Sequence, residues 1–147
     1  IVRWPGRIPA GVTCDRVTGF EDWLPTLLEL IGAAAEVPVG VDGRSFAPTL
    51  LGQPQPERPF LYREFPGYGA QQAVWAEGWK AIRQGLAKQA AAGASATVKT
   101  ELYHLATDPG ETRDVAAEQP ETLRRLEALL RAQHTPSTPF PLPMIDR

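Results

Sequence analysis

The sequence has little cysteine, little net charge and no long apolar run. With Cys14 as the one cysteine among 147 residues, the chain cannot form an internal disulfide, a CxxC metal site or a CxxC redox site. Fifteen Lys and Arg residues against 17 Asp and Glu residues give a net charge of −2, which argues against a nucleic-acid partner and against a polybasic membrane patch. The apolar stretch Leu24–Ile31 is interrupted by Pro25, Thr26 and Glu29 and is far too short to span a membrane.

The composition is that of an ordinary folded domain with many turns. Hydrophobic residues make up 43% and charged residues 22% of the chain, and it contains 15 Pro and 13 Gly. The sequence opens on the strand-like run Ile1–Trp4, with no initiator methionine and no signal-peptide pattern. Because a strand needs neighbours for its backbone groups, we expect another portion of the same protein to precede residue 1.

Residues 1–59 predict one strand and two helices as the main elements of a first part. The strand is Ile1–Trp4, with a further short strand over Val17–Gly19. Ser45 can cap a short helix over Phe46–Leu51. A longer helix is expected over residues 20–31, because apolar residues recur there at spacings of three and four. They are Phe20, Trp23, Leu24, Leu27, Leu28 and Ile31.

Residues 60–147 predict a small antiparallel sheet with one long helix. Period-two patterns indicate four strands, namely Phe60–Phe65, Gln71–Trp75, Trp79–Arg83 and Glu101–Leu105. The Ala- and Gly-rich segment Lys88–Thr97 is expected to be a flexible loop. A helix is expected from Pro120 to near His134, with a buried stripe of Leu123, Leu126 and Leu130. The Pro-rich tail Thr135–Arg147 is expected to lie extended along the surface. The fold class is therefore α+β.

Isolated reactive residues form no complete catalytic site in the sequence. Cys14 is either a nucleophile activated by Arg16 or a loop thiol without a role. His104 is a ligand, a base or a half-exposed sheet residue, and His134 is favoured as a partner of the helix dipole. The acidic residues Asp108, Glu111 and Asp114 lack the spacing of a calcium loop and favour a turn. Glu21 and Asp22 are adjacent and favour helix capping over paired acid–base chemistry.

The loop Phe65–Gln72 is the best candidate for a binding feature. It joins two predicted strands and is rich in glycine, and loops that a rigid sheet presents often contact ligands. Its candidate substrate-binding residues are Tyr68, Gln71 and Gln72. A plain surface loop is the alternative. We expect no catalytic residue and no metal ligand in the chain.

Several motifs, taken in order, resemble the C-terminal part of a type I sulfatase of the arylsulfatase-like family. The opening IVRWPGRIPAG resembles the family's "IVRWPGxIPAG", and DWLPTLLEL followed by Gly32 resembles "DxxPTLL[DE]L". DGRS, YREF, QAV with WK, and ELYHLATDPGE resemble "DGxS", "YxEF", "QAV…WK" and "ELYxLxxDPGE". The end of the chain, HTPS with FPL, resembles that of many bacterial members. The motifs extend over nearly the whole length.

The resemblance implies a fold and a division of labour. Residues 1–59 would end an alkaline-phosphatase-like α/β domain, and residues 60–147 would form a small subdomain with a four-stranded antiparallel sheet and a helix. The parent enzyme would hydrolyse sulfate esters of aryl or carbohydrate substrates, using formylglycine and Ca²⁺ from its preceding catalytic portion. It would be periplasmic or secreted in a bacterium. This chain would be non-catalytic, structural and involved in the substrate pocket.

The sequence also departs from the family pattern. Cys14 lacks the C/S-x-P-x-R context of the formylglycine precursor, so it is not that residue. Trp75 stands where a basic residue is usual, Arg63 where an aromatic residue is usual, and Pro66 where a histidine is common. Two alternatives therefore stay open, namely a non-catalytic binding or scaffold module and a part of a related phosphatase or phosphonate hydrolase.

Overall fold

The protein is described here by a computed structural model that covers residues 1–87 and 98–146. The expected flexible loop Lys88–Thr97 lies outside the described residues. The chain divides into two compact units, Ile1–Arg58 and Pro59–Arg147, called unit 1 and unit 2 below. No helix among the described residues is both long and apolar enough to cross a lipid bilayer.

Unit 1 is built from short helices and long connections. Its elements are the 3-10 helix η1 (Phe20–Asp22), α1 (Trp23–Leu30), the 3-10 helix η2 (Ala34–Glu36) and α2 (Ala47–Leu50). The two predicted helices are confirmed, and the Ser45 hydroxyl accepts a hydrogen bond from the Ala47 N–H at 3.1 Å. The predicted strands are wrong. Neither Ile1–Trp4 nor Val17–Gly19 is a strand, because the described residues of unit 1 offer no neighbouring strand for pairing.

Asp22 joins the separate segments of unit 1. Its side chain is almost fully buried and accepts hydrogen bonds from the Gly19 N–H at 2.6 Å and the Arg44 N–H at 2.8 Å. The Arg58 guanidinium pairs with the same carboxylate at 2.8 Å. Because a buried carboxylate is tolerated only with such partners, Asp22 is structural. Its predicted capping role applies to η1, whose N-cap residue Gly19 donates to it, whereas Asp22 as the N-cap residue of α1 makes no side-chain bond to that helix.

The apolar face of α1 is largely open in unit 1. Phe20 is 87% exposed and Ile31 is 73% exposed, and Leu24 and Leu27 are about half exposed. The residues of this helix that are buried are Pro25 and Thr26. The helix is thus amphipathic as predicted, but its apolar side does not form the core of this unit.

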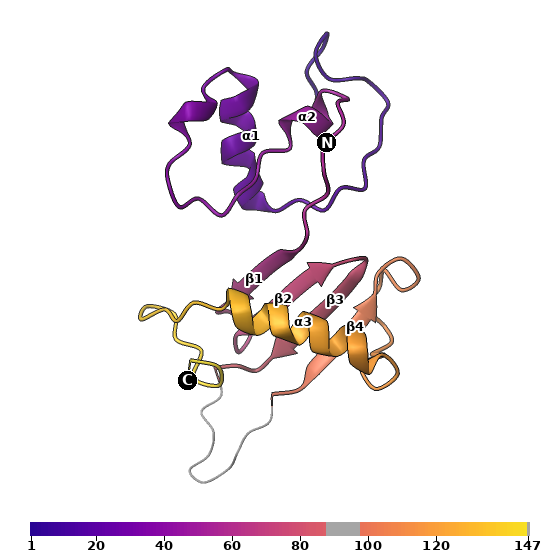
Figure 1. The fold of residues 1–147 in the computed structure, drawn as a ribbon, viewed down its shortest axis with the longest axis vertical. Helices are drawn as coiled ribbons and strands as arrows, with labels where there is room; N and C mark the ends of the chain where they lie inside the picture. The colour runs from indigo at the N-terminus through magenta and orange to yellow at the C-terminus, as the bar shows by residue number, and fades with distance from the viewer. Residues whose placement is uncertain (88–97, 147) are drawn as a thin grey trace. The chain divides into compact units, whose positions relative to one another are not determined.

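Unit 2 is a four-stranded antiparallel sheet with one helix across it. The strands are β1 (Leu61–Phe65), β2 (Gln71–Ala76), β3 (Trp79–Gln84) and β4 (Thr100–His104), in the order β1-β2-β3-β4. Helix α3 (Pro120–Gln133) lies across one face of this sheet (Figure 1). Each predicted strand is confirmed to within one residue at either end. The α+β fold class is confirmed as well.

The core of unit 2 lies between α3 and the sheet. Val74, Ala81 and Leu102 occupy neighbouring positions across three strands and contact Leu126 and Leu130 of α3. All five are at most 1% exposed, and Leu123 packs at the edge of the cluster. The predicted leucine stripe therefore faces the sheet. This packing fixes the sheet and gives its loops a rigid base.

Asp114 ties the connection after β4 back to the sheet. It accepts hydrogen bonds from the N–H groups of Leu102 at 3.1 Å and Ala116 at 3.0 Å, and Lys99 pairs with it at 2.8 Å. Burial alone would raise the pKa of Asp114, but the Lys99 contact and the two backbone donors hold it below its ordinary value. Asp114 thus contributes stability above the ordinary aspartate pKa, about 3.9, and loses it as the pH falls through the lowered value.

Asn in place of Asp114 is therefore expected to destabilise unit 2 near neutral pH and much less in acid. Hydrogen bonds to charged groups contribute about 1.5–3 kcal/mol, so we expect a loss of that order at pH 7. Urea unfolding of wild type and variant at pH 7 and at pH 3 measures the difference. Glu118→Gln changes the same charge at an exposed position and is the control. An equal loss for Asp114→Asn at both pH values would contradict this account.

Candidate functional site

The loop between β1 and β2 presents an exposed aromatic pair. Tyr68 is 89% exposed and Phe65 is 52% exposed, and their ring centroids lie 5.9 Å apart at an interplanar angle of 39°. Tyr68 and Ala70 have positive φ values of 53° and 64°, which non-glycine residues adopt at a cost. The backbone is thus held in an unusual course that leaves the Tyr68 ring in solvent.

The base of this loop is firmly attached to the sheet. Ala70 is 1% exposed, and its carbonyl accepts a hydrogen bond from the Leu86 N–H at 3.1 Å, while the Gly69 carbonyl accepts one from the Ala87 N–H at 2.9 Å. The ring of Phe65 lies over Gly67, where an added Cβ would stand 2.6 Å from a ring carbon. A side chain at position 67 would therefore displace the Phe65 ring from this place.

The three predicted substrate-binding residues do not lie together. Tyr68 is in the loop, and Gln71 begins β2 as a half-buried residue opposite Phe65 and Gln84. Gln72 is 1% exposed, because successive side chains of a strand point to opposite faces and this one points toward α3. Its amide nitrogen donates to the Tyr62 hydroxyl oxygen at 2.8 Å and to the Leu130 carbonyl at 2.9 Å.

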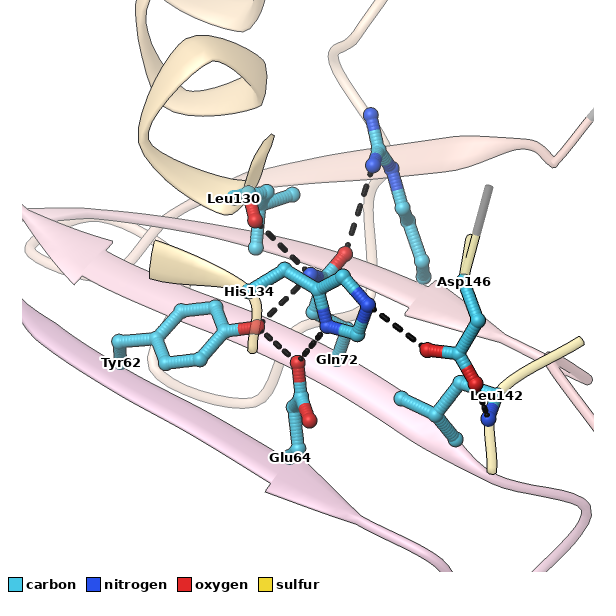
Figure 2. Close-up of polar contacts among 8 residues, drawn as sticks. Tyr62, Glu64, Gln72, Leu130, His134, Leu142 and Asp146 are labelled. Carbon is cyan, nitrogen blue, oxygen red and sulfur yellow. Dashed lines mark hydrogen bonds and ion pairs between the residues drawn. The ribbon is translucent and has the colours of Figure 1, made fainter. Parts of the chain in front are cut away.

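A partly buried polar network connects β1, β2 and the end of the chain, with His134 at its centre (Figure 2). The Nδ1 atom of His134 lies 2.6 Å from Glu64 Oε1, and its Nε2 atom lies 2.8 Å from Asp146 Oδ1. The Tyr62 hydroxyl donates to the same Glu64 oxygen. The His134 side chain is 11% exposed. Each polar atom of the imidazole ring therefore has a protein partner.

This arrangement corrects the prediction that His134 is a partner of the helix dipole. Helix α3 ends at Gln133, and His134 already has extended dihedral angles, so its ring points into the network instead of capping the helix. Its partners lie 70 residues before it and 12 residues after it in the chain. No local sequence signal connects such distant positions, and the network was therefore missed.

The prediction of an extended surface tail agrees with the largely exposed residues 135–141, which form no helix or strand, and is wrong for residues 142–146. The tail ends in a turn in which Leu142 is 2% exposed. The side chain of Asp146 accepts a hydrogen bond from the Leu142 N–H at 2.5 Å, and the Leu142 carbonyl accepts one from the Asp146 N–H at 2.9 Å. The turn forms around this one buried leucine. The high proline content of the tail favours an extended chain and gives no sign of such a turn.

The second half of the network joins the sheet to α3. Arg83, which is 8% exposed, donates to Thr100 Oγ1 at 3.0 Å and to Gln72 Oε1 at 3.3 Å, and it pairs with Glu127 at 3.3 Å. Burial, and next the hydrogen bond to Glu64, raise the pKa of the Tyr62 phenol far above its ordinary value. The phenol is thus held in its neutral, donating form.

Cys14 and His104, the remaining candidate residues, each contact neighbouring protein groups. Cys14 is exposed in unit 1, where its sulfur accepts a hydrogen bond from the Arg16 N–H at 3.4 Å, and both histidines belong to unit 2. The His104 ring packs 4.4 Å from Trp79 and its Nδ1 lies 2.8 Å from the Thr107 hydroxyl. His104 is thus the half-exposed sheet residue that one of the three interpretations predicted.

The acidic residues that follow β4 serve separate contacts. Asp108 accepts hydrogen bonds from the N–H groups of Thr112 and Arg113, which hold the pKa of its carboxyl below the ordinary value. Glu111 pairs with Lys80 at 2.6 Å, and Asp114 serves the contacts given above. Within residues 1–87 and 98–146, no group of three or more His, Cys, Asp or Glu side chains is arranged to hold a metal ion.

Comparison with known proteins identifies the relatives of this chain. The family model of the C-terminal part of N-sulphoglucosamine sulphohydrolase matches residues 1–135. Leu142 and Asp146 lie beyond that match. The N-acetylgalactosamine-6-sulfatase of Canis lupus familiaris is 30% identical over 128 residues, which cover 76% of this chain and 24% of that protein.

Solved structures show the same fold. A protein described in complex with its substrate D-glucosamine-2-N,6-O-disulfate has a TM-score of 0.57 at 23% identity, over 76% of this chain and 22% of that one. The phosphonate monoester hydrolase of Agrobacterium radiobacter has a TM-score of 0.54 at 26% identity, over 83% of this chain and 26% of that one. The chain thus spans about a quarter of the length of these relatives.

Proposed function

The chain belongs to the sulfatase family, and from that premise we propose that it is the C-terminal part of an enzyme that hydrolyses sulfate esters. The observation that carries the proposal is the family match over residues 1–135, together with curated relatives that are sulfatases. Relatives named for N-acetylgalactosamine 6-sulfate and for steryl sulfate support a substrate in which a carbohydrate or another ring carries the sulfate.

The residues of this chain do not fit the cofactors that the family resemblance implies. Cys14 lacks the context of a formylglycine precursor, and Asp108, Glu111 and Asp114 are each engaged with a different protein partner. We therefore propose that formylglycine and Ca²⁺ belong to the preceding portion of the protein. This chain performs no bond-breaking step.

The proposed partner of unit 1 is that preceding portion. This partner is supported by the open apolar face of α1, which carries Phe20, Leu24, Leu27 and Ile31. Burying one such side chain contributes about 1.5–3 kcal/mol, so covering all four would contribute several kcal/mol to docking. The apolar chemistry of the face matches a hydrophobic interface within one protein.

The proposed role of unit 2 is to present Tyr68 to the substrate. The exposed ring stands on a loop whose base is fixed by Ala70 and Gly69, and such preorganised aromatic rings provide large contact areas at low entropic cost. Gln71, at the start of β2, is near enough in the chain to contribute a polar contact. Gln72 supports both from the core, where its amide is bonded to Tyr62 and Leu130.

The full-length protein is expected to hydrolyse sulfate esters faster than phosphonate esters, with Tyr68 contributing to substrate binding. The phosphonate hydrolase neighbour makes the phosphonate the informative competitor. Removing an aromatic contact of about 0.5–1.5 kcal/mol corresponds to about a two- to tenfold rise in KM, and we expect this for Tyr68→Ala. Steady-state kinetics with 4-nitrophenyl sulfate, N-acetylgalactosamine 6-sulfate and phenyl 4-nitrophenyl phosphonate measures both effects.

Tyr68→Phe is the matched control, because it retains the ring and should keep KM within about twofold of wild type. A preference for the phosphonate would assign the protein to the phosphonate hydrolases instead. No turnover of any ester by the full-length protein would favour a non-catalytic binding module. An unchanged KM in Tyr68→Ala would remove Tyr68 from the substrate pocket.

A further inference from the structure

The chain after α3 returns to the loop that carries Tyr68. Leu142, which is 2% exposed, forms a small hydrophobic cluster with Ala70 and Leu86, and Met144 and Ile145 pack at its edge. Ala70 is the last residue of the loop before β2. The tail therefore contacts the loop at the residue that holds a φ value of 64°.

The turn that presents Leu142 is closed by its own polar contacts. The Ile145 N–H and the Asp146 N–H both donate to the Leu142 carbonyl, at 2.8 Å and 2.9 Å. The Asp146 side chain accepts a hydrogen bond from the Leu142 N–H at 2.5 Å through one oxygen. Its other oxygen lies 2.8 Å from His134 Nε2. One carboxylate thus holds the turn and attaches it to the end of α3.

His134 continues this attachment to the sheet. Its Nδ1 atom contacts Glu64, which neighbours Phe65 at the end of β1 and pairs with Gln72 of β2. Glu64 and Asp146 thus lie on opposite sides of the imidazole, one at each ring nitrogen. Figure 2 shows the imidazole between the two acidic side chains, with Leu142 beside Asp146. These contacts reach both ends of the loop, Phe65 through Glu64 and Ala70 through Leu142.

We propose that His134 and Asp146 are positioning residues, which act with Leu142 as a tail latch that fixes the loop 66–70 and thereby the Tyr68 ring. The tail latch means His134, Leu142 and Asp146. The proposal rests on the proposed function, in which Tyr68 contacts the sulfated substrate. The proposal assigns a role in substrate binding to Leu142 and Asp146, which lie beyond the family match. They act through Ala70 and do not contact the substrate.

The expected consequence of opening the tail latch is a selective change in substrate binding. In the full-length protein, Asp146→Ala should raise KM for N-acetylgalactosamine 6-sulfate about fivefold and leave kcat within twofold, because the residue does not contact reacting atoms. Hydrogen exchange of a peptide covering residues 66–72 should become several times faster. Peptides from α3 should keep their wild-type exchange, which shows that the variant is folded.

Two further variants make the test specific. Asp146→Asn keeps an acceptor oxygen for the Leu142 N–H and should restore most of the wild-type KM. Glu118→Ala removes an exposed acidic side chain that pairs with Arg113 and should change neither KM nor the exchange of residues 66–72. If Asp146→Ala prevents folding, His134→Gln serves for the same comparison, because it alters the attachment and leaves the turn intact.

The two proposals fail in different ways. Wild-type KM in Asp146→Ala, beside a raised KM in Tyr68→Ala, overturns the tail latch alone. Wild-type KM in Tyr68→Ala removes Tyr68 from the substrate pocket, and with it the premise of the tail latch, but leaves the proposed sulfate-ester hydrolysis to be decided by the turnover of the esters. A raised KM in Asp146→Ala with unchanged exchange at residues 66–72 also overturns the tail latch, because the effect would then not pass through the loop.

Discussion

Alanine in place of Leu130 is expected to lower the free energy of unfolding of unit 2 by about 3–5 kcal/mol. Leu130 is fully buried against Val74, Ala81 and Leu102, and removing a buried leucine side chain costs its transfer free energy and the energy of the cavity that remains, together about 2–5 kcal/mol. We expect the upper part of that range. Val74 and Ala81 lie opposite each other in the β2–β3 pairing, and the backbone hydrogen bonds of these strands oppose a movement into the space that Leu130 leaves.

Urea unfolding followed by tryptophan fluorescence measures this loss, since Trp79 packs beside the same core. Leu129→Ala is the matched control on the same helix. Leu129 is half-buried and lies at the edge of the cluster, so its loss should be less than half as large. Similar losses for the two variants would show that α3 is not packed with Leu130 toward the sheet.

The fold of unit 2 could be predicted from sequence because its signals are local. Two short runs with aromatic and aliphatic residues, Gln71–Ala76 and Trp79–Gln84, are separated by Glu77-Gly78, and this arrangement favours a hairpin without reference to distant residues. The spacing of Leu123, Leu126 and Leu130 specifies the buried side of α3 in the same way. The leucine stripe therefore follows from periodicity, and the hairpin from its turn.

The failed predictions depended on distant partners. Ile1–Trp4 has the composition of a strand, but a strand forms only where another backbone pairs with it. His134 was interpreted through its place at a helix end, whereas its partners Glu64 and Asp146 come from β1 and the tail. Gln72 was grouped with Tyr68 by its nearness in sequence. Successive side chains of a strand point to opposite faces of the sheet. The Gln72 side chain therefore points toward α3 and not to the face of its neighbour Gln71.

The two units are expected to differ in local stability within the isolated chain. In unit 1, the buried apolar residues among those described are Pro25, Phe46 and Ala47. Helix α1 has eight residues, well below the roughly 12–15 residues at which even favourable isolated helices become stable. Its stability must therefore come from packing, and its apolar face is largely exposed.

Amide hydrogens of α1 are therefore expected to exchange at least about a hundredfold faster than those of α3, relative to their intrinsic rates. A hundredfold difference corresponds to about 2.8 kcal/mol in opening free energy, which is less than the packing of Leu126 and Leu130 provides. Hydrogen exchange by mass spectrometry on the monomeric chain compares peptides from the two helices. In Leu130→Ala, exchange should accelerate in α3 and stay unchanged in α1.

The same measurement on the full-length protein tests the docking of unit 1. If the open face of α1 packs against the preceding portion, burial of Leu24 and Leu27 should slow the exchange of α1 amides until they approach those of α3. Polar substitution separates this effect from helix propensity. Leu27→Gln keeps a good helix former, so it should leave α1 exchange in the isolated chain nearly unchanged and accelerate it in the full-length protein. Equal, strong protection of both helices in the isolated monomer would show that unit 1 is stable by itself and that its apolar face needs no cover.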